Sequence, residues 1–290
     1  MSRNNKKLTY AVCSWLLLVV FCMQFVVSFC VKNYWKGTPT QYDYILLTQV
    51  FSIVLPSLIV CLLYGKGIKK TFRIKKIKTS KALGCIGMGL CIQPVAILVN
   101  IPLQNVVSGR GGVVASPENI VQVMIMTVIV CLVPAFCEEL LLRGMLLGSV
   151  KKKGYAFSII VTTVMFVILH GDAGTVAGHA VLGIATAFAV LNTNSVLAGF
   201  FVHFSFNFCG LIIDYILNRL YVPGGFLGSF DFFLITGLVG VAFSTVLFKC
   251  VHSKKVKKYR SEDLFYNLWE AFATVPFAAM VIIYVLYAVM

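Results

Sequence analysis

Two adjacent glutamates and an arginine interrupt a long apolar stretch near the middle of the chain, Phe136-Cys137-Glu138-Glu139-Leu140-Leu141-Leu142-Arg143. A charged side chain at the centre of a membrane helix costs roughly 2.5–3.5 kcal/mol on insertion scales, so three such groups must pair, face the protein interior or take part in chemistry. On a helix, Glu139 and Arg143 are four residues apart and can form an ion pair. Glu138 points about 100° away from Glu139 and is therefore available for another role.

Further polar side chains with helical spacing follow in later apolar stretches. Phe166 precedes His170 by four residues, and His203 precedes Asn207 by four residues. Glu138 and His170 are equally far along the chain from the predicted turn between two antiparallel helices, so we expect them at similar depth. His203 and Asn207 are also expected at mid-membrane, on another helix. The spacing therefore allows four hydrogen-bonding groups from three helices to converge.

This set of side chains suits the hydrolysis of an amide by an activated water. Apolar surroundings favour the protonated carboxyl group and a neighbouring imidazole stabilises the carboxylate, so Glu138 beside His170 can take a proton from water. His203 and Asn207 can donate hydrogen bonds to the oxyanion of a tetrahedral intermediate. The sequence has no His-Glu-x-x-His motif, and none of its serines or cysteines has an obvious base partner. These features argue against the common zinc and nucleophile designs.

The composition places these residues in an integral membrane protein. The 290 residues are 59% hydrophobic and only 12% charged, whereas about 25% of the residues of a soluble domain are charged. Apolar stretches of helix length without strand-like alternation predict an all-α fold, a polytopic transmembrane bundle of about eight to nine helices in one domain over residues 1–290. The ten cysteines lie almost wholly within apolar stretches and lack metal-like spacing, so we expect no disulfide framework.

Nine apolar stretches are the candidate spans. The last is the weakest, because it contains Asn267, Glu270 and Pro276. The third contains Pro94 and Pro102, which predict a kink. The approximate bounds are 9–31, 44–64, 82–106, 120–147, 154–170, 176–191, 195–217, 230–248 and 265–290.

The basic residues predict the orientation of this bundle. If the N-terminus is cytoplasmic, 20 of the 25 Lys and Arg residues fall on inside segments, most densely between Lys66 and Lys81. This asymmetry follows the positive-inside rule. It also accounts for the net charge of +15, which therefore does not indicate nucleic-acid binding. The five remaining basic residues are the intramembrane Arg143 and the outside Lys32, Lys36, Arg110 and Arg219.

In order along the chain, the motifs Glu138-Glu139-x-x-x-Arg143, Phe166-x-x-x-His170 and His203-x-x-x-Asn207 resemble those of the CPBP family. These are the CAAX-protease and bacteriocin-processing membrane proteins, which include the type II CAAX prenyl endopeptidases. The resemblance covers about residues 82–250, a family-like core between extra N-terminal spans (9–64) and the C-terminal span (265–290).

The resemblance implies an intramembrane glutamic endopeptidase that cleaves a membrane-associated peptide or protein, in the cell membrane if the source is bacterial. Its catalytic residues would be Glu138 and His170, which activate water, and His203 and Asn207, which bind the oxyanion. Glu139, Arg143 and Phe166 would have supporting roles. The resemblance implies no required cofactor and leaves a metal-dependent mechanism open.

Two other functions stay open at this point. A non-catalytic immunity or scaffold protein could keep the polar core for stability, although it would not need an oxyanion-binding pair. A transporter could use Glu138 and the histidines as a proton relay, although the sequence has no inverted repeat with paired broken helices. His179 and His252 are expected to be bystanders, and Asp172, in a glycine-rich loop, is expected to be solvated.

Overall fold

The computed structural model describes residues 8–34, 40–64, 67–106, 115–220, 222–223, 225–252 and 263–289, which form helices and connecting segments without any strand. Seven helices within these ranges are long and apolar enough to cross a membrane, and an eighth span results if one bent pair of helices is counted. The predicted all-α polytopic bundle is therefore confirmed.

The seven long helices follow the predicted apolar stretches closely. They are α1 (Tyr10–Tyr34), the helix Gln41–Tyr64, α5 (Thr79–Val106), the helix Ile120–Lys153, α10 (Val176–Thr193), α11 (Val196–Leu220) and α12 (Phe230–Val251).

Two of the nine predicted spans differ from the prediction. The stretch before His170 forms α9 (Tyr155–His170), whose 16 residues are fewer than the roughly 20 that cross a bilayer upright. The last stretch forms α13 (Leu264–Phe272) and α14 (Val275–Val289), which meet at an angle of 70°. The described residues thus contain seven or eight candidate spans, against the eight to nine predicted.

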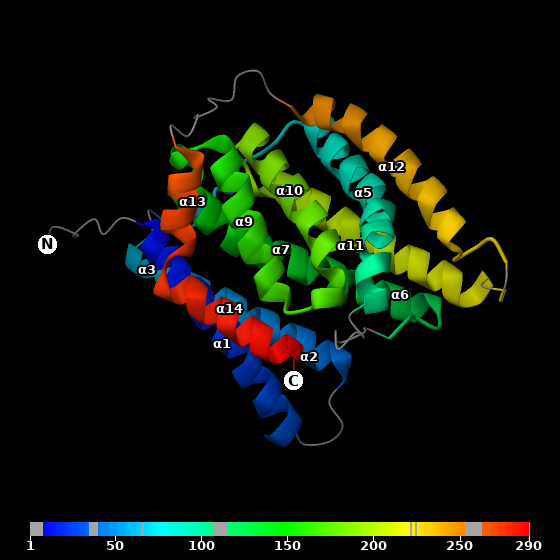
Figure 1. The fold of residues 1–290 in the computed structure, drawn as a ribbon, viewed down its shortest axis with the longest axis horizontal. Coiled ribbons are helices and arrows are strands. Elements are labelled where there is room, and N and C mark those ends of the chain that lie inside the picture. The colour runs from blue at the N-terminus through cyan, green and yellow to red at the C-terminus, as the bar shows by residue number, and fades with distance from the viewer. Residues whose placement is uncertain are drawn as a thin grey trace, which may run out of the picture.

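The helices that carry the predicted site lie in the middle of the bundle (Figure 1). α10 packs against α9, and α11 packs against both α10 and α5. α12 lies along the outer side of α5 (Figure 1). α1 packs against the helix Gln41–Tyr64 and against α14, and the same helix Gln41–Tyr64 reaches the double-glutamate segment. The N-terminal spans are therefore part of the wall around the site.

The helix Ile120–Lys153 changes its hydrogen-bond pattern along its length. Its segments are α6 (Ile120–Met126), the π-helix η2 (Thr127–Leu132), α7 (Val133–Glu139), the π-helix η3 (Leu140–Leu146), α8 (Leu147–Val150) and the 3-10 turn η4 (Lys151–Lys153). The helix Gln41–Tyr64 likewise consists of α2 (Gln41–Leu47), the π-helix η1 (Thr48–Val54) and α3 (Leu55–Tyr64). Such π segments are rare and often occur at functional sites.

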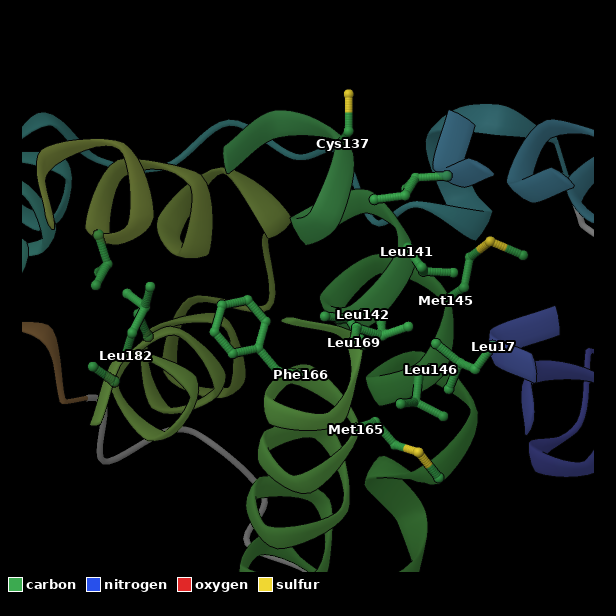
Figure 2. Close-up of a cluster of buried hydrophobic side chains, with 14 of the residues drawn as sticks. Leu17, Cys137, Leu141, Leu142, Met145, Leu146, Met165, Phe166, Leu169 and Leu182 are labelled. Atoms are coloured by element: carbon green, nitrogen blue, oxygen red, sulfur yellow. The ribbon is translucent and has the colours of Figure 1, made fainter. Parts of the chain in front are cut away.

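The largest hydrophobic cluster lies beside the double-glutamate segment. Side chains of η3 pack there against α1 and α9 (Figure 2), and the labelled members include Leu141, Leu142, Met145 and Phe166, all essentially fully buried. Lipid is as apolar as these side chains, so close packing, rather than transfer from water, holds them together. Small residues aid this packing: a Cβ at Gly183 of α10 would lie only 2.9 Å from Thr163 of α9.

Candidate active site

A cavity of about 710 Å³ opens between the central helices. Its lining includes all four side chains that the sequence nominates as catalytic: Glu138 on α7, His170 at the end of α9, and His203 and Asn207 on α11. The structure therefore brings together residues that are up to 69 positions apart in the sequence.

Glu138 and His170 face each other across the hairpin between α8 and α9. The distance between His170 Nε2 and Glu138 Oε2 is 3.6 Å, and the two side chains are 23% and 12% exposed. Their near-equal separation from the turn accounts for this contact, because antiparallel helices that leave one turn rise by the same length per residue. The gap is longer than a direct hydrogen bond, so one water molecule can contact both groups.

The backbone fixes the tautomer of His170. Its Nδ1 lies 2.8 Å from the carbonyl oxygen of Phe166, one helical turn earlier. A carbonyl oxygen only accepts hydrogen bonds, so Nδ1 carries a proton and donates it. In the neutral ring, Nε2 is then an acceptor that faces the Glu138 carboxyl group.

A residue outside the predicted motifs holds the other oxygen of Glu138. Gln49, on the π-helix η1, donates from Nε2 to Glu138 Oε1 over 3.0 Å, and its side chain is buried. Each carboxylate oxygen thus has its own neighbour: Gln49 at Oε1 and His170 at Oε2. The sequence carries one signal for this role, an amide within an apolar stretch, but Gln49 belongs to none of the three motifs.

Behind Glu138 lies a second, smaller cavity. Its volume is about 170 Å³, and Gln24 of α1, Glu138 and His170 provide its polar lining. A space of this size with polar groups can hold water. Glu138 therefore has room for water on two sides.

Glu139 has two partners in the protein interior. Its Oε1 lies 2.9 Å from Arg143 Nη1, which is the predicted ion pair, and 3.2 Å from His203 Nδ1. All three side chains are buried. α11 can approach this closely only because residue 199 is glycine: a Cβ there would overlap Glu139 Oε2.

The ring of Phe166 lies among the polar side chains of Arg143, His170 and His203. It is fully buried, and the Arg143 guanidinium lies 4.7 Å from its centroid. The rings of His170 and His203 lie 4.4 Å and 5.6 Å away, the second edge-on. Such cation–π and edge contacts hold flat groups in fixed orientations. Phe166 therefore orients side chains of three helices and takes no part in proton transfer.

Asn207 makes a weak contact with the neighbouring helix. Its side-chain nitrogen lies 3.5 Å from the carbonyl oxygen of Val130, at the limit of hydrogen bonding. Asn207 is thus held lightly at the cavity wall and can turn towards a ligand.

Two neighbouring residues lie closer to the site than the sequence indicates. The ring of His179 lies 3.9 Å from that of His170, and His179 lines the large cavity. Asp172 is not simply solvated, because it caps the 3-10 turn η5 (Ala173–Thr175), accepting hydrogen bonds from Gly174 N and Thr175 Oγ1, and it lines the same cavity. The sequence alone did not place α10 against the end of α9.

The side chains do not form a metal centre in this arrangement. Among the residues that the structure describes, no group of three His, Cys, Asp or Glu side chains could hold a metal ion. The donor set therefore does not fit a zinc site, which needs three protein ligands around the ion.

The part of the chain that contains the three motifs also matches a known protein family. Residues 120–209 match the family model described as type II CAAX prenyl endopeptidase Rce1-like. A search of curated proteins and a search of solved structures gave no match. The match to the Rce1-like family confirms the resemblance, and it contains all three motifs.

The Rce1-like match supports a membrane-embedded peptidase with a peptide substrate, and neither the immunity or scaffold function nor the transporter is favoured by it. It ends before α12 and begins after α5, so the wider core of residues 82–250 stays a prediction. Gln49 and the rest of the N-terminal spans lie outside the matched residues.

Proposed function

We propose that this protein is an intramembrane endopeptidase of the glutamic type, in which Glu138 activates water to hydrolyse a peptide bond. The observation that carries the proposal is the setting of one carboxyl group. Glu138 Oε1 accepts a hydrogen bond from Gln49, while Oε2 has no hydrogen-bond partner among the described residues and lies 3.6 Å from His170 Nε2, beside a cavity of about 710 Å³. A carboxylate with only a structural role would not leave one buried oxygen unpaired next to an imidazole.

In this mechanism, the water bound between Glu138 and His170 gives a proton to Glu138 Oε2 as its oxygen attacks the peptide carbonyl. Hydrogen bonding to Nε2 of His170 orients the same water. The proton then passes to the leaving amine as the tetrahedral intermediate collapses. Gln49 keeps Oε1 occupied, so proton transfer is directed to Oε2.

His203 and Asn207 stabilise the oxyanion, and the geometry sets a condition for His203. Its Nδ1 faces Glu139 Oε1 at 3.2 Å and donates its proton to that oxygen. Nε2 can therefore donate to an oxyanion only if the ring carries a proton on both nitrogens. Glu139 also fixes the orientation of this ring, since its Oε1 lies 3.2 Å from His203 Nδ1, in addition to its ion pair with Arg143.

The substrate is a membrane-associated peptide or protein. The large cavity lies between the central helices and is lined by the four predicted catalytic residues. In this proposal, a substrate segment enters it from the bilayer. With the predicted orientation, the N-terminus and the turn Lys151–Lys153 are cytoplasmic. Bacteriocin processing and self-immunity are hypotheses that rest on the sequence resemblance.

The Asn207→Ala variant tests the oxyanion assignment. Because it removes one donor to the intermediate, we expect kcat to fall by about 10²–10³-fold with little change in KM. The measurement is cleavage of a membrane-anchored peptide by purified protein. Asn218→Ala on the exposed end of the same helix is the control and should keep wild-type kcat. An Asn207→Ala variant with wild-type kcat would exclude this residue from the oxyanion site.

The Gln49→Met variant tests the orientation of Glu138. Methionine has a similar shape but no donor, and a hydrogen bond to a charged group contributes about 1.5–3 kcal/mol, so we expect kcat to fall by roughly tenfold or more. KM should change little, because Gln49 contacts the base and not the substrate. Ser52→Ala, buried on the same π-helix, is the control. If Gln49→Met lowers melting temperature but not kcat, Gln49 is only structural.

A further inference from the structure

A further hollow lies at the C-terminal end of the helix Ile120–Lys153, away from the predicted catalytic residues. Its volume is about 440 Å³, and its lining combines four basic side chains with apolar ones such as Leu8 and Met145. The basic side chains are Lys70, Arg73, Lys151 and Lys152. Among the described residues, no Asp or Glu lines this hollow.

Arg73 is the most buried of the four basic side chains in this pocket. Unlike the exposed lysines of the same loop, it is only 6% exposed. Its Nη2 donates to Asn194 Oδ1 over 2.7 Å and its Nη1 to the Arg143 carbonyl over 3.4 Å, while its Nε has no hydrogen-bond partner among the described residues. Burial lowers the pKa of the Arg73 guanidinium to about 10, so it keeps its charge at neutral pH. A buried, charged, incompletely paired guanidinium calls for an anion.

Two glycines bring the loop against the helix. A Cβ at Gly144 would lie 3.0 Å from the Cα of Phe72, and one at Gly148 would contact Cδ of Arg73 at 3.5 Å. Arg73 itself has a left-handed backbone, with φ of 57°, which is uncommon for a residue with a side chain. The chain thus accepts local strain to hold this guanidinium at the pocket wall.

We propose that this pocket binds a phosphate-bearing anion, and that its natural source is the headgroup of an anionic phospholipid. Arginine and lysine supply the donors that phosphate prefers. The apolar wall beside them suits the first carbons of an acyl chain, which a soluble phosphate lacks. Basic pockets between membrane helices are known to bind such headgroups. The positive-inside rule alone explains solvated lysines, but not a buried arginine in a pocket.

The test compares lipid retention by the full-length protein in neutral detergent, where no charged bilayer surface contributes. Phosphatidylglycerol, phosphatidylcholine and inorganic phosphate are titrated separately, and bound lipid is counted by native mass spectrometry alongside the melting temperature. We expect one phosphatidylglycerol to be retained by wild type. The combined Lys70→Gln, Lys151→Gln and Lys152→Gln variant should bind it at least about tenfold more weakly. The matched variant Lys69→Gln, Lys76→Gln and Lys78→Gln loses equal charge outside the pocket and should bind like wild type.

Three results would overturn the proposal in different ways. Equal retention of phosphatidylcholine would show that the phosphate-bearing anion is not what is recognised. Equal losses in the two triple variants would mean that general charge, and not this pocket, attracts the lipid. Stabilisation by inorganic phosphate without retained phosphatidylglycerol would assign the pocket to a soluble anion and overturn the lipid source. The variants retain Arg73 and so keep its hydrogen bonds to the fold.

Discussion

Glu138→Gln is expected to abolish peptide cleavage while the protein folds as wild type. Glutamine keeps the size of the side chain and can still accept the hydrogen bond from Gln49, which is 3.0 Å away. It cannot take a proton from water, however, and general-base catalysis typically contributes 10²–10⁴-fold in rate. We therefore expect a loss of at least about 10²-fold, measured as cleavage of a membrane-anchored peptide.

The control for this experiment is Glu118→Gln, which removes an exposed carboxylate just before the same helix begins. It should leave both cleavage and melting temperature unchanged. If Glu138→Gln retains activity within tenfold of wild type, Glu138 is not the base and the mechanism proposed here is wrong.

The second large effect concerns the buried charges beside the base. Glu139→Ala leaves the Arg143 guanidinium, which is 0% exposed, without its carboxylate, and Arg143→Ala leaves Glu139 without its cation. Breaking a buried ion pair costs about 3–5 kcal/mol. We expect each variant to show a much lower melting temperature in detergent or a lower yield. Wild-type melting of both variants would contradict a structural role for the pair.

A double variant separates stability from function. Glu139→Leu with Arg143→Met removes both charges and fills the space with apolar side chains, which is often neutral for stability. The melting temperature should therefore recover towards wild type. Activity should not recover, because His203 loses the carboxylate 3.2 Å from its Nδ1. Recovery of both properties would show that activity does not require Glu139 to orient His203.

The sequence predicts the site well where local geometry decides it. The spacing of Glu139 and Arg143 gave their ion pair, and the near-equal distances of Glu138 and His170 from one turn gave their contact. Both follow from regular helix geometry and need no knowledge of the packing. The apolar stretches likewise gave the all-α bundle and most helix bounds.

The remaining features depend on packing between helices that are distant in sequence. Gln49 reaches Glu138 from 89 positions away, and nothing in its own stretch indicates which helix it faces. The close approach of the His179 ring to that of His170 requires the short loop after α9 to fold α10 back on it. The π segments around Glu138 and the 70° bend between α13 and α14 are also set by tertiary contacts.

Cleavage by metal-free protein is the most direct test of the central claim that Glu138 activates water without a metal. Wild type and Glu138→Gln are treated exhaustively with chelator, placed in vesicles with a membrane-anchored peptide, and the products are identified by mass spectrometry. We expect the wild-type protein to cleave a peptide bond at its untreated rate and the variant to leave the peptide intact. If chelation stops the wild-type protein and stoichiometric zinc restores it, or if both proteins cleave equally, the account is contradicted.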